Sequence, residues 1–282
     1  MSKFSDRMKV TTPKSILQID SMDMDLRNGL WNGVVMSYME TIGSGWYKST
    51  PGNYQALWVR IWLHVFKGRI DELDEHGQDF VRQVKDYFFN AAWYEVYNFI
   101  EFVKDNFEND FNANINEQFV YYCNRVLEKE LSAYRFVNGI LTPISSSEEI
   151  QAVETALQIE DKYLPVKNHL AKALQHLSNK TKPDYKNSVK ESICAVESLC
   201  CILTGKTNAT LGDSLKLLEK NYDLHGSLKR GFENLYGYAS DGQGIRHGGG
   251  MMEKSNLSQD EAIFMLVTCS AFTNYLVKKI GV

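Results

Sequence analysis

The chain contains 282 residues, of which 44% are hydrophobic and 23% are charged, a composition typical of a globular protein. This length predicts two modest domains or one large one, with enough core to fold without disulfides or structural metals. The formal net charge of -4 excludes a polycation that binds nucleic acid through its overall charge, so any such contact requires a local basic patch.

The five cysteines predict a reducing compartment and no disulfide framework. Their number is odd and their spacing shows no pairs. Four of them lie in segments with helical periodicity, where a free cysteine behaves as a small core residue: Cys194, Cys200, Cys201 and Cys269. The N-terminus lacks the apolar core of a signal peptide, and no window approaches eighteen apolar residues. We therefore expect a soluble, cytoplasmic protein that does not enter a membrane.

The first half of the chain has the apolar spacing of amphipathic helices. Apolar residues recur at steps of three and four in residues 53–68, 91–103 and 116–131. Trp58 and Trp62 lie four residues apart, which raises the alternative of a stacking platform for nucleic-acid bases. Aromatic residues at helical spacing usually face inward, however, so we expect both to pack in the core.

A short β-hairpin interrupts the helices near residues 133–144. Asn138 and Gly139 separate two short β-rich runs there, which is the strongest short hairpin signal. A helical pattern with a serine cap resumes directly afterwards. We therefore predict a mainly α fold with two helical domains, at residues 1–145 and 146–282.

The second domain is expected to be an antiparallel bundle of four or five helices. Its first helix covers residues 147–179 and is interrupted or kinked at Pro165. Asp184 and Gly205 have the positions of an N-cap and a C-terminal glycine around the next helix. The remaining expected helices span residues 211–221, 225–238 and 257–280.

The stretch "DGQGIRHGGG", residues 241–250, feeds the last of these helices, which opens on capping-box spacing between Ser258 and Glu261. Arginine offers a planar fork of donors that matches phosphate oxygens, and histidine exchanges protons near neutral pH. Glycines let the backbone approach a ligand closely. These types suit phosphodiester chemistry, with His247 for proton transfer and Arg246 for transition-state charge. The alternative is a flexible connection.

Aromatic and polar residues surround this pair in the sequence. Two tyrosines lie upstream, and the glycines on both sides allow backbone contact with a ligand. The candidate RNA- or nucleotide-binding residues are therefore Tyr236, Tyr238, Asp241, Gly244 and Gly248.

Glu197 is the third candidate catalytic residue. At about 100° per residue, it falls on the shoulder of the apolar stripe of its helix, between Ile193 and Cys200. A carboxylate there must be exposed at the rim or paired, because burying it unpaired costs several kcal/mol. Arg246 is the partner that we choose, and a solvated shoulder residue is the alternative.

The sequence gives little support for a metal-binding site or for a serine-hydrolase active site. His169 and His176 are seven residues apart on one expected helix face, but no cysteine or carboxylate completes a tetrahedral set at typical spacing. Surface histidines are the better interpretation, so we expect no metal and no cofactor. Ser188 and Ser192 do not sit in a nucleophile-elbow pattern, which argues against a serine hydrolase.

Three segments of the second half together resemble the HEPN superfamily, and more narrowly the C-terminal bundle of AbiJ-like abortive-infection proteins. They are "DYKNSVKESICAVESLC", "LYGYASDGQGIRHGGG" and "DEAIFMLVTCSAFTNYL". In the first half, "FSDRM", "LRNGLWNGV" and "YRFVNGILTPISSSEEI" are similar to the helical N-terminal domain of those phage-defence proteins. The resemblance covers nearly the whole chain.

The resemblance implies a bundle that homodimerises and places arginine and histidine in a composite cleft. Many such proteins are metal-independent RNA endonucleases, in which these residues promote attack of a 2′-hydroxyl on the adjacent phosphate. The family signature is Arg, four to six residues, then His. Arg246 matches the arginine, whereas His247 follows it directly, and no other histidine comes later in the chain.

Two functions therefore stand as hypotheses. The first is a defence-associated ribonuclease or toxin that acts on RNA through a dimeric cleft with Arg246, His247 and Glu197. The second is a non-catalytic module that binds a nucleotide, RNA or a phage protein. Expected partners are RNA or a nucleotide, a second copy joined through the C-terminal bundle, and a phage or antitoxin protein. A purely structural role in dimerisation is the third alternative.

Overall fold

The protein is described from a computed structural model, which covers residues 16–39, 52–73, 77–108, 114–179, 182–206, 210–241 and 257–280. Most of these residues are in α-helices, which confirms the mainly α fold. The chain divides into two compact units, Met1–Pro143 and Ile144–Val282. Each unit has its own set of packed helices and is described separately.

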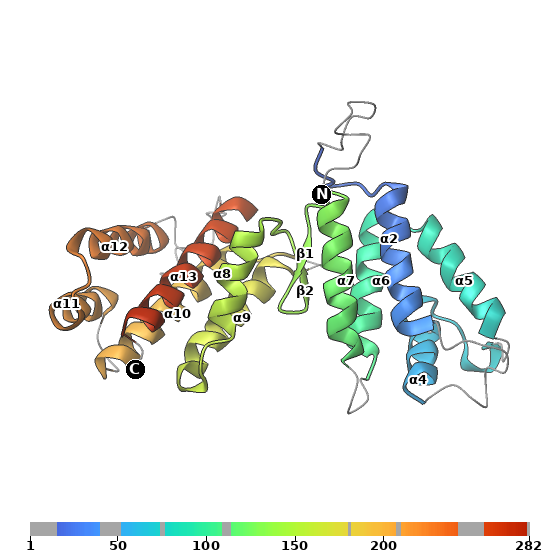
Figure 1. The fold of residues 1–282 in the computed structure, drawn as a ribbon, viewed down its shortest axis with the longest axis horizontal. Coiled ribbons are helices and arrows are strands. Elements are labelled where there is room, and N and C mark those ends of the chain that lie inside the picture. Colours follow the sequence, from blue (N-terminus) through green and yellow to red (C-terminus); the bar gives the residue numbers. More distant parts are fainter. Residues whose placement is uncertain are drawn as a thin grey trace, which may run out of the picture. The chain divides into compact units, whose positions relative to one another are not determined.

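The first unit is built from helices (Figure 1). Their inward faces form a core that is rich in aromatic side chains. The helices expected at residues 91–103 and 116–131 are confirmed as α6 and α7. Large side chains fill the space between the helices, among them Trp58, Phe80 and Phe88, each at most 1% exposed. Its α-helices are α2 (Met24–Val34), α4 (Gly52–Arg60), α5 (Gly77–Asn90), α6 (Trp93–Asn106) and α7 (Ile115–Lys129).

Two of these helices change pitch at their C-terminal ends. α2 continues into the π-helical turn η1 (Val35–Met39), and α4 continues into η2 (Ile61–Val65). In η2 the Phe66 amide donates to the Ile61 carbonyl at 3.2 Å, five residues back. The helix expected over residues 53–68 is therefore only in part an α-helix. Residue periodicity does not predict such a single π-helical turn.

The two tryptophans that suggested a stacking platform belong to the protein's own packing. Trp58 is 1% exposed and its ring centroid lies 4.7 Å from that of Phe80. Trp62 is half-buried, 6.2 Å from the same ring, and its indole N–H donates to the Arg69 carbonyl at 2.7 Å. The expectation of core packing is thus confirmed for Trp58, and Trp62 lies at the edge of the same aromatic cluster.

The hairpin forms at the expected place. Strands β1 (Arg135–Val137) and β2 (Ile140–Thr142) pair antiparallel. The turn residues Asn138 and Gly139 have φ values of 47° and 77°, both in the left-handed region. Glycine adopts this region freely and asparagine tolerates it, which is why this dipeptide specifies the tight hairpin turn.

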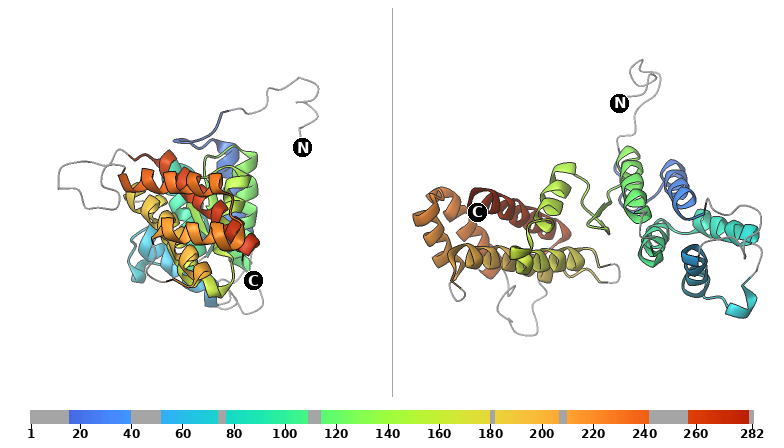
Figure 2. Two further views of the ribbon diagram at one scale, coloured as in Figure 1. Left: turned by 90° about the vertical axis from the view of Figure 1, so that its left-hand side faces the viewer. Right: turned by 60° about the horizontal axis from the view of Figure 1, so that its bottom comes forward.

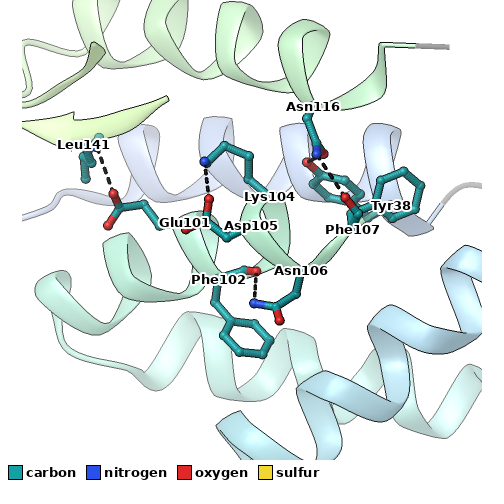
Figure 3. Close-up of polar contacts among 9 residues, drawn as sticks. All are labelled: Tyr38, Glu101, Phe102, Lys104, Asp105, Asn106, Phe107, Asn116 and Leu141. Carbon is teal, nitrogen blue, oxygen red and sulfur yellow. Dashed lines mark hydrogen bonds and ion pairs between the residues drawn. The ribbon is translucent and has the colours of Figure 1, made fainter. Parts of the chain in front are cut away.

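Side chains of two helices fix the hairpin in the first unit. The buried Glu101 of α6 accepts a hydrogen bond from the Leu141 amide at 2.8 Å (Figure 3). Asn124 of α7 contacts β1 twice, since its amide group donates to the Phe136 carbonyl at 2.9 Å and accepts from the Phe136 amide at 2.8 Å. Strands of three residues need such support, because an isolated hairpin is marginally stable in water.

Helices α2 and α7 approach each other closely at two glycines of α2. A Cβ atom at Gly29 would lie 2.4 Å from Val126 Cγ1, and one at Gly33 would lie 2.9 Å from Tyr122 Cδ1. Neither distance is possible for real atoms without movement of the neighbour. The spacing of four residues places both glycines on the same face of α2, so that this face packs against α7.

We expect Gly29→Ala to lower the free energy of unfolding by about 1–3 kcal/mol, because the β-branched Val126 has little freedom to move away. This steric loss acts against the gain of about 1 kcal/mol that alanine brings over glycine in helix propensity. Urea unfolding of the full chain measures it. The control is Gly231→Ala in the second unit, where an added Cβ meets nothing within 4 Å and stability should stay equal or rise. Equal effects of the two substitutions would contradict the close packing of α2 on α7.

The second unit is an antiparallel bundle in which α10 packs against α9, α13, α11 and α12 (Figures 1 and 2). α13 lies next to α10 and also packs against α8 and α9. The helices are α8 (Ser147–Leu157), α9 (Leu164–Leu177), α10 (Tyr185–Thr204), α11 (Leu211–Tyr222), α12 (Gly226–Asp241) and α13 (Gln259–Ile280).

The first helix expected in this unit is in fact two helices. α8 ends at Leu157, and the 3-10 turn η4 (Asp161–Tyr163) leads into α9. Pro165 lies in the first turn of α9, where proline is tolerated because no intrahelical partner exists for its missing N–H. The break therefore precedes the proline. Tyr163, which is 2% exposed, anchors the turn in the core.

The caps predicted for α10 are confirmed. The Asp184 side chain accepts from the Asn187 amide at 3.0 Å, and Gly205 ends the helix with φ 68°. These two signals are local in sequence, so they fix the helix ends independently of the rest of the bundle.

α13 is the one helix in the described part of the chain that is long and apolar enough to cross a membrane by length and composition alone. Nine of its residues are buried inside the second unit, which accounts for its apolar character. A central helix of a bundle passes the same test, so the finding is weak support for a membrane span. The cytoplasmic location stays a prediction.

Candidate functional site

The candidate site lies at the connection between α12 and α13. Gly244, Arg246, His247 and Gly248 fall outside the described residues. α12 runs as far as Asp241, three residues beyond the expected end, so the stretch "DGQGIRHGGG" begins on a helix. The connection therefore joins the last turn of α12 to the first turn of α13.

Both helices that hold this connection have defined contacts. Phe232 of α12 stacks on Phe272 of α13, with ring centroids 3.3 Å apart and an angle of 14° between the planes. At the start of α13 the Ser258 amide donates to Glu261 Oε2 at 2.7 Å, and the Asp260 amide donates to Ser258 Oγ at 3.2 Å. Hydrogen bonds from Ser258 hold the pKa of Glu261 below its usual value. This confirms that Ser258 and Glu261 cap the helix that follows the connection.

Tyr236 and Tyr238 both lie on the last part of α12. Tyr236 is half-buried, whereas Tyr238 is 44% exposed. Residues two apart on a helix project about 200° apart, so the two rings leave α12 on different sides. Asp241 is the last helical residue after them. Their roles in contacting RNA or a nucleotide stay predictions.

Glu197 is half-buried on α10, which fits the shoulder position that its helical angle predicted. Its carboxylate lies beside two thiols of the next turn. Burial raises the pKa of Cys200 to about 12, and the nearby charges of Cys201 and Glu197 contribute in the same direction. Burial and the Glu197 charge likewise raise the pKa of Cys201. The pairing of Glu197 with Arg246 stays a prediction.

The interface between α9 and α10 contains a polar pair that was not predicted from the sequence. His169 Nδ1 lies 2.7 Å from Glu191 Oε2, with the two side chains 30% and 17% exposed. The residues are 22 positions apart, so only the register of the two antiparallel helices brings them together. The other histidine of α9, His176, is also half-buried and lies one turn from the loop to α10.

The serines of α10 bind backbone oxygens. The buried Ser188 hydroxyl donates to the Ala173 carbonyl at 2.9 Å, and the buried Ser192 hydroxyl donates to the Ser188 carbonyl at 2.9 Å. All five cysteines are free thiols. Within the described ranges, no group of three or more histidines, cysteines or carboxylates could hold a metal ion.

A comparison with protein families identifies the first part of the chain. The family model of AbiJ N-terminal domain 4 matches residues 2–159. The chain belongs to this family. Membership confirms the AbiJ part of the resemblance and places the chain in the context of abortive infection, a bacterial defence against phages. Comparisons with curated proteins and with solved structures gave no match.

The match to the AbiJ N-terminal domain extends beyond the first compact unit. That unit ends at Pro143, whereas the match continues to residue 159 and includes all of α8. α8 packs against α13, and the Ala152 carbonyl accepts from the Asn274 side chain at 2.8 Å. One helix of the AbiJ N-terminal domain is thus part of the second compact unit.

Proposed function

We propose that this AbiJ-family chain is a phage-defence protein whose second unit is a HEPN-type bundle acting as a metal-independent endoribonuclease. The observation that carries the proposal is the place of Arg246 and His247. They lie in the connection between α12 and α13, two helices that stack on each other through Phe232 and Phe272. The HEPN part rests on the quoted segments of the second half, because the family match ends at residue 159.

The proposed reaction is an internal transfer at a phosphodiester. The 2′-hydroxyl oxygen of RNA attacks the adjacent phosphorus, and the bond from phosphorus to the 5′-oxygen breaks. His247 exchanges the proton that leaves the 2′-hydroxyl or reaches the 5′-oxygen, and Arg246 stabilises the added negative charge on the phosphate. The products carry a 2′,3′-cyclic phosphate and a 5′-hydroxyl, and no metal is required.

The proposed enzyme acts as a homodimer through the second unit. Adjacent residues usually point in different directions, so a second copy is the simplest way to bring Arg246 and His247 to one phosphate. The solvent side of α13 supports such an interface, because Phe264 is 54% exposed and Tyr275 is 39% exposed. Ala271 lies exposed between them at helical spacing, which gives α13 an apolar stripe on its outer face.

A second function is favoured by the adjacency of the two residues. The HEPN signature separates arginine and histidine by four to six residues, and this chain has none between them. A connection that retains Arg246 for phosphate contact without catalysis would act as a binding or sensor module for a nucleotide, RNA or a phage protein.

The test is cleavage of a labelled single-stranded RNA by the purified full chain in excess EDTA. The proposal expects turnover, with cyclic phosphate and 5′-hydroxyl ends on the products. Saturable RNA binding without turnover would assign the second function instead. Cleavage that disappears on addition of EDTA would contradict the metal-independent mechanism.

A further inference from the structure

α12 is the least buried helix of the second unit. None of residues 226–238, the part of α12 whose side chains the structure describes, is buried. Every other α-helix of this unit buries at least three side chains. Leu228 is 36% exposed, and Phe232 and Leu235 are half-buried. Most helical stability in a protein comes from burying an apolar face, so α12 is held weakly.

Two glycines inside α12 weaken it further, and packing does not require them. A Cβ atom added at Gly231 or Gly237 would meet none of the described atoms within 4 Å. At Gly29 and Gly33 of α2, by contrast, an added Cβ would collide with α7. Glycine in a helix interior is less favourable than any residue except proline. The glycines of α12 therefore lower the stability of the helix without allowing a closer contact.

The start of α12 is anchored more firmly than the rest. In the turn before it, the Asp223 carbonyl accepts from Lys279 Nζ of α13 at 2.8 Å, and Leu224 is 1% exposed. In the middle of the helix, Phe232 stacks on the buried Phe272 of α13. Figures 1 and 2 show α11 and α12 at one end of the bundle. α12 can therefore leave the bundle while the turn at residues 223–225 stays in place.

We propose that α12 is a lid that opens by local unfolding, with the turn at residues 223–225 as its hinge. An isolated helix of this length is marginal in water, so α12 loses its helix when it leaves the bundle. Opening uncovers Phe272 and releases the start of the connection that contains Arg246 and His247. The folded α12 is thus the state that positions the connection. This positioning role rests on the proposed function, whereas the opening itself does not.

The test is hydrogen–deuterium exchange of the full chain, read by mass spectrometry. After correction for intrinsic rates, amides of α12 should exchange at least about tenfold faster than those of α10 and α13, because local opening costs less than unfolding of the bundle. Equal protection of the three helices would overturn the proposal. A second copy that covers α12 would give this result.

Two variants should change this opening in opposite directions. Gly231→Ala with Gly237→Ala should slow the exchange of α12 about 20-fold, since each alanine favours the helix about four- to fivefold. Phe232→Ala should speed it at least about threefold, because the stack on Phe272 is lost. Exchange of α10 and α13 should stay within about twofold in both variants. Equal changes in all three helices would mean global unfolding and would contradict a lid.

The matched control is Gly212→Ala, the same substitution in the neighbouring α11, where an added Cβ makes only ordinary contacts at 3.9 and 4.0 Å. It should change the exchange of α12 less than about twofold. Slowing as large as in the α12 variant would mean that α11 and α12 open together, which would contradict the hinge at residues 223–225.

RNA cleavage by the same variants tests the positioning role. Phe232→Ala should cleave at least about threefold more slowly than the parent, while the double alanine variant of α12 should cleave at least as fast. Unchanged cleavage in Phe232→Ala, together with faster exchange of α12, would refute positioning by the lid. If neither the parent nor any variant cleaves RNA, the ribonuclease is refuted, and the exchange rates still decide whether α12 opens.

Discussion

Replacing Arg246 or His247 by alanine is expected to lower the rate of RNA cleavage by at least about 100-fold. Removing a proton-transfer group or a transition-state charge partner typically costs about 10² to 10⁴ in rate. Initial rates on a labelled single-stranded RNA, measured with EDTA present, give the effect. Folding should be unchanged, because both residues precede α13, whose buried residues begin only at Ala262.

The matched controls for this prediction are Arg230→Ala and His225→Asn, at the start of α12. Both residues are exposed, and His225 Nδ1 accepts from the Ser227 amide at 3.2 Å. Asparagine keeps an acceptor at this cap, so the substitution removes the imidazole while α12 keeps its start. Cleavage should proceed at close to the parent rate in both controls. Unchanged cleavage in Arg246→Ala and His247→Ala would refute the assigned site.

Removal of α8 is expected to unfold the second unit. The fragment 144–282 should unfold cooperatively in urea, whereas the fragment 160–282 should lack a cooperative transition. α8 buries Val153 and Leu157, which contribute about 1.5–3 kcal/mol each, and its loss also uncovers apolar residues of α13. A typical domain is stable by only about 5–15 kcal/mol.

Far-UV circular dichroism during urea unfolding compares the two fragments directly. This comparison separates two ways of dividing the chain, at the boundary of the compact units or at the end of the AbiJ family match. If both fragments have equal midpoints, α8 belongs with the first unit and its contact with α13 adds no stability.

The elements that could be predicted from the sequence are those with local signals. Asp184 and Gly205 set the ends of α10, and Asn138 with Gly139 sets the hairpin, because each acts through its own backbone or a neighbouring amide. The helical angle of Glu197 likewise gave its half-buried position on α10. These features do not depend on which helices lie next to each other.

The features that could not be predicted depend on contacts between distant segments. The π-helical turn at Ile61–Val65 occurs where the rings of Trp62 and Phe66 pack around Phe80. The pair of His169 and Glu191 requires the register of α9 against α10. Sequence periodicity shows which face of each helix is apolar, but it does not contain this register.

The candidate site also has a part that local sequence signals predict and a part that they do not. The start of α13 follows from a local signal, the Ser258 cap, whereas α12 runs to Asp241, three residues beyond the end expected from the sequence. How Arg246 and His247 are placed on a phosphate depends on the proposed second copy. A site that takes Arg246 from one copy and His247 from the other can be tested directly in mixed dimers.

The measurement is RNA cleavage by Arg246→Ala and His247→Ala chains produced together in one cell. In a symmetric dimer whose two sites each take Arg246 from one copy and His247 from the other, every mixed dimer has one intact site. With random pairing, the mixture should regain about a quarter of the parent activity, while each variant alone stays inactive. A mixture as inactive as the separate variants, in which mass measurement confirms mixed dimers, would contradict the shared site.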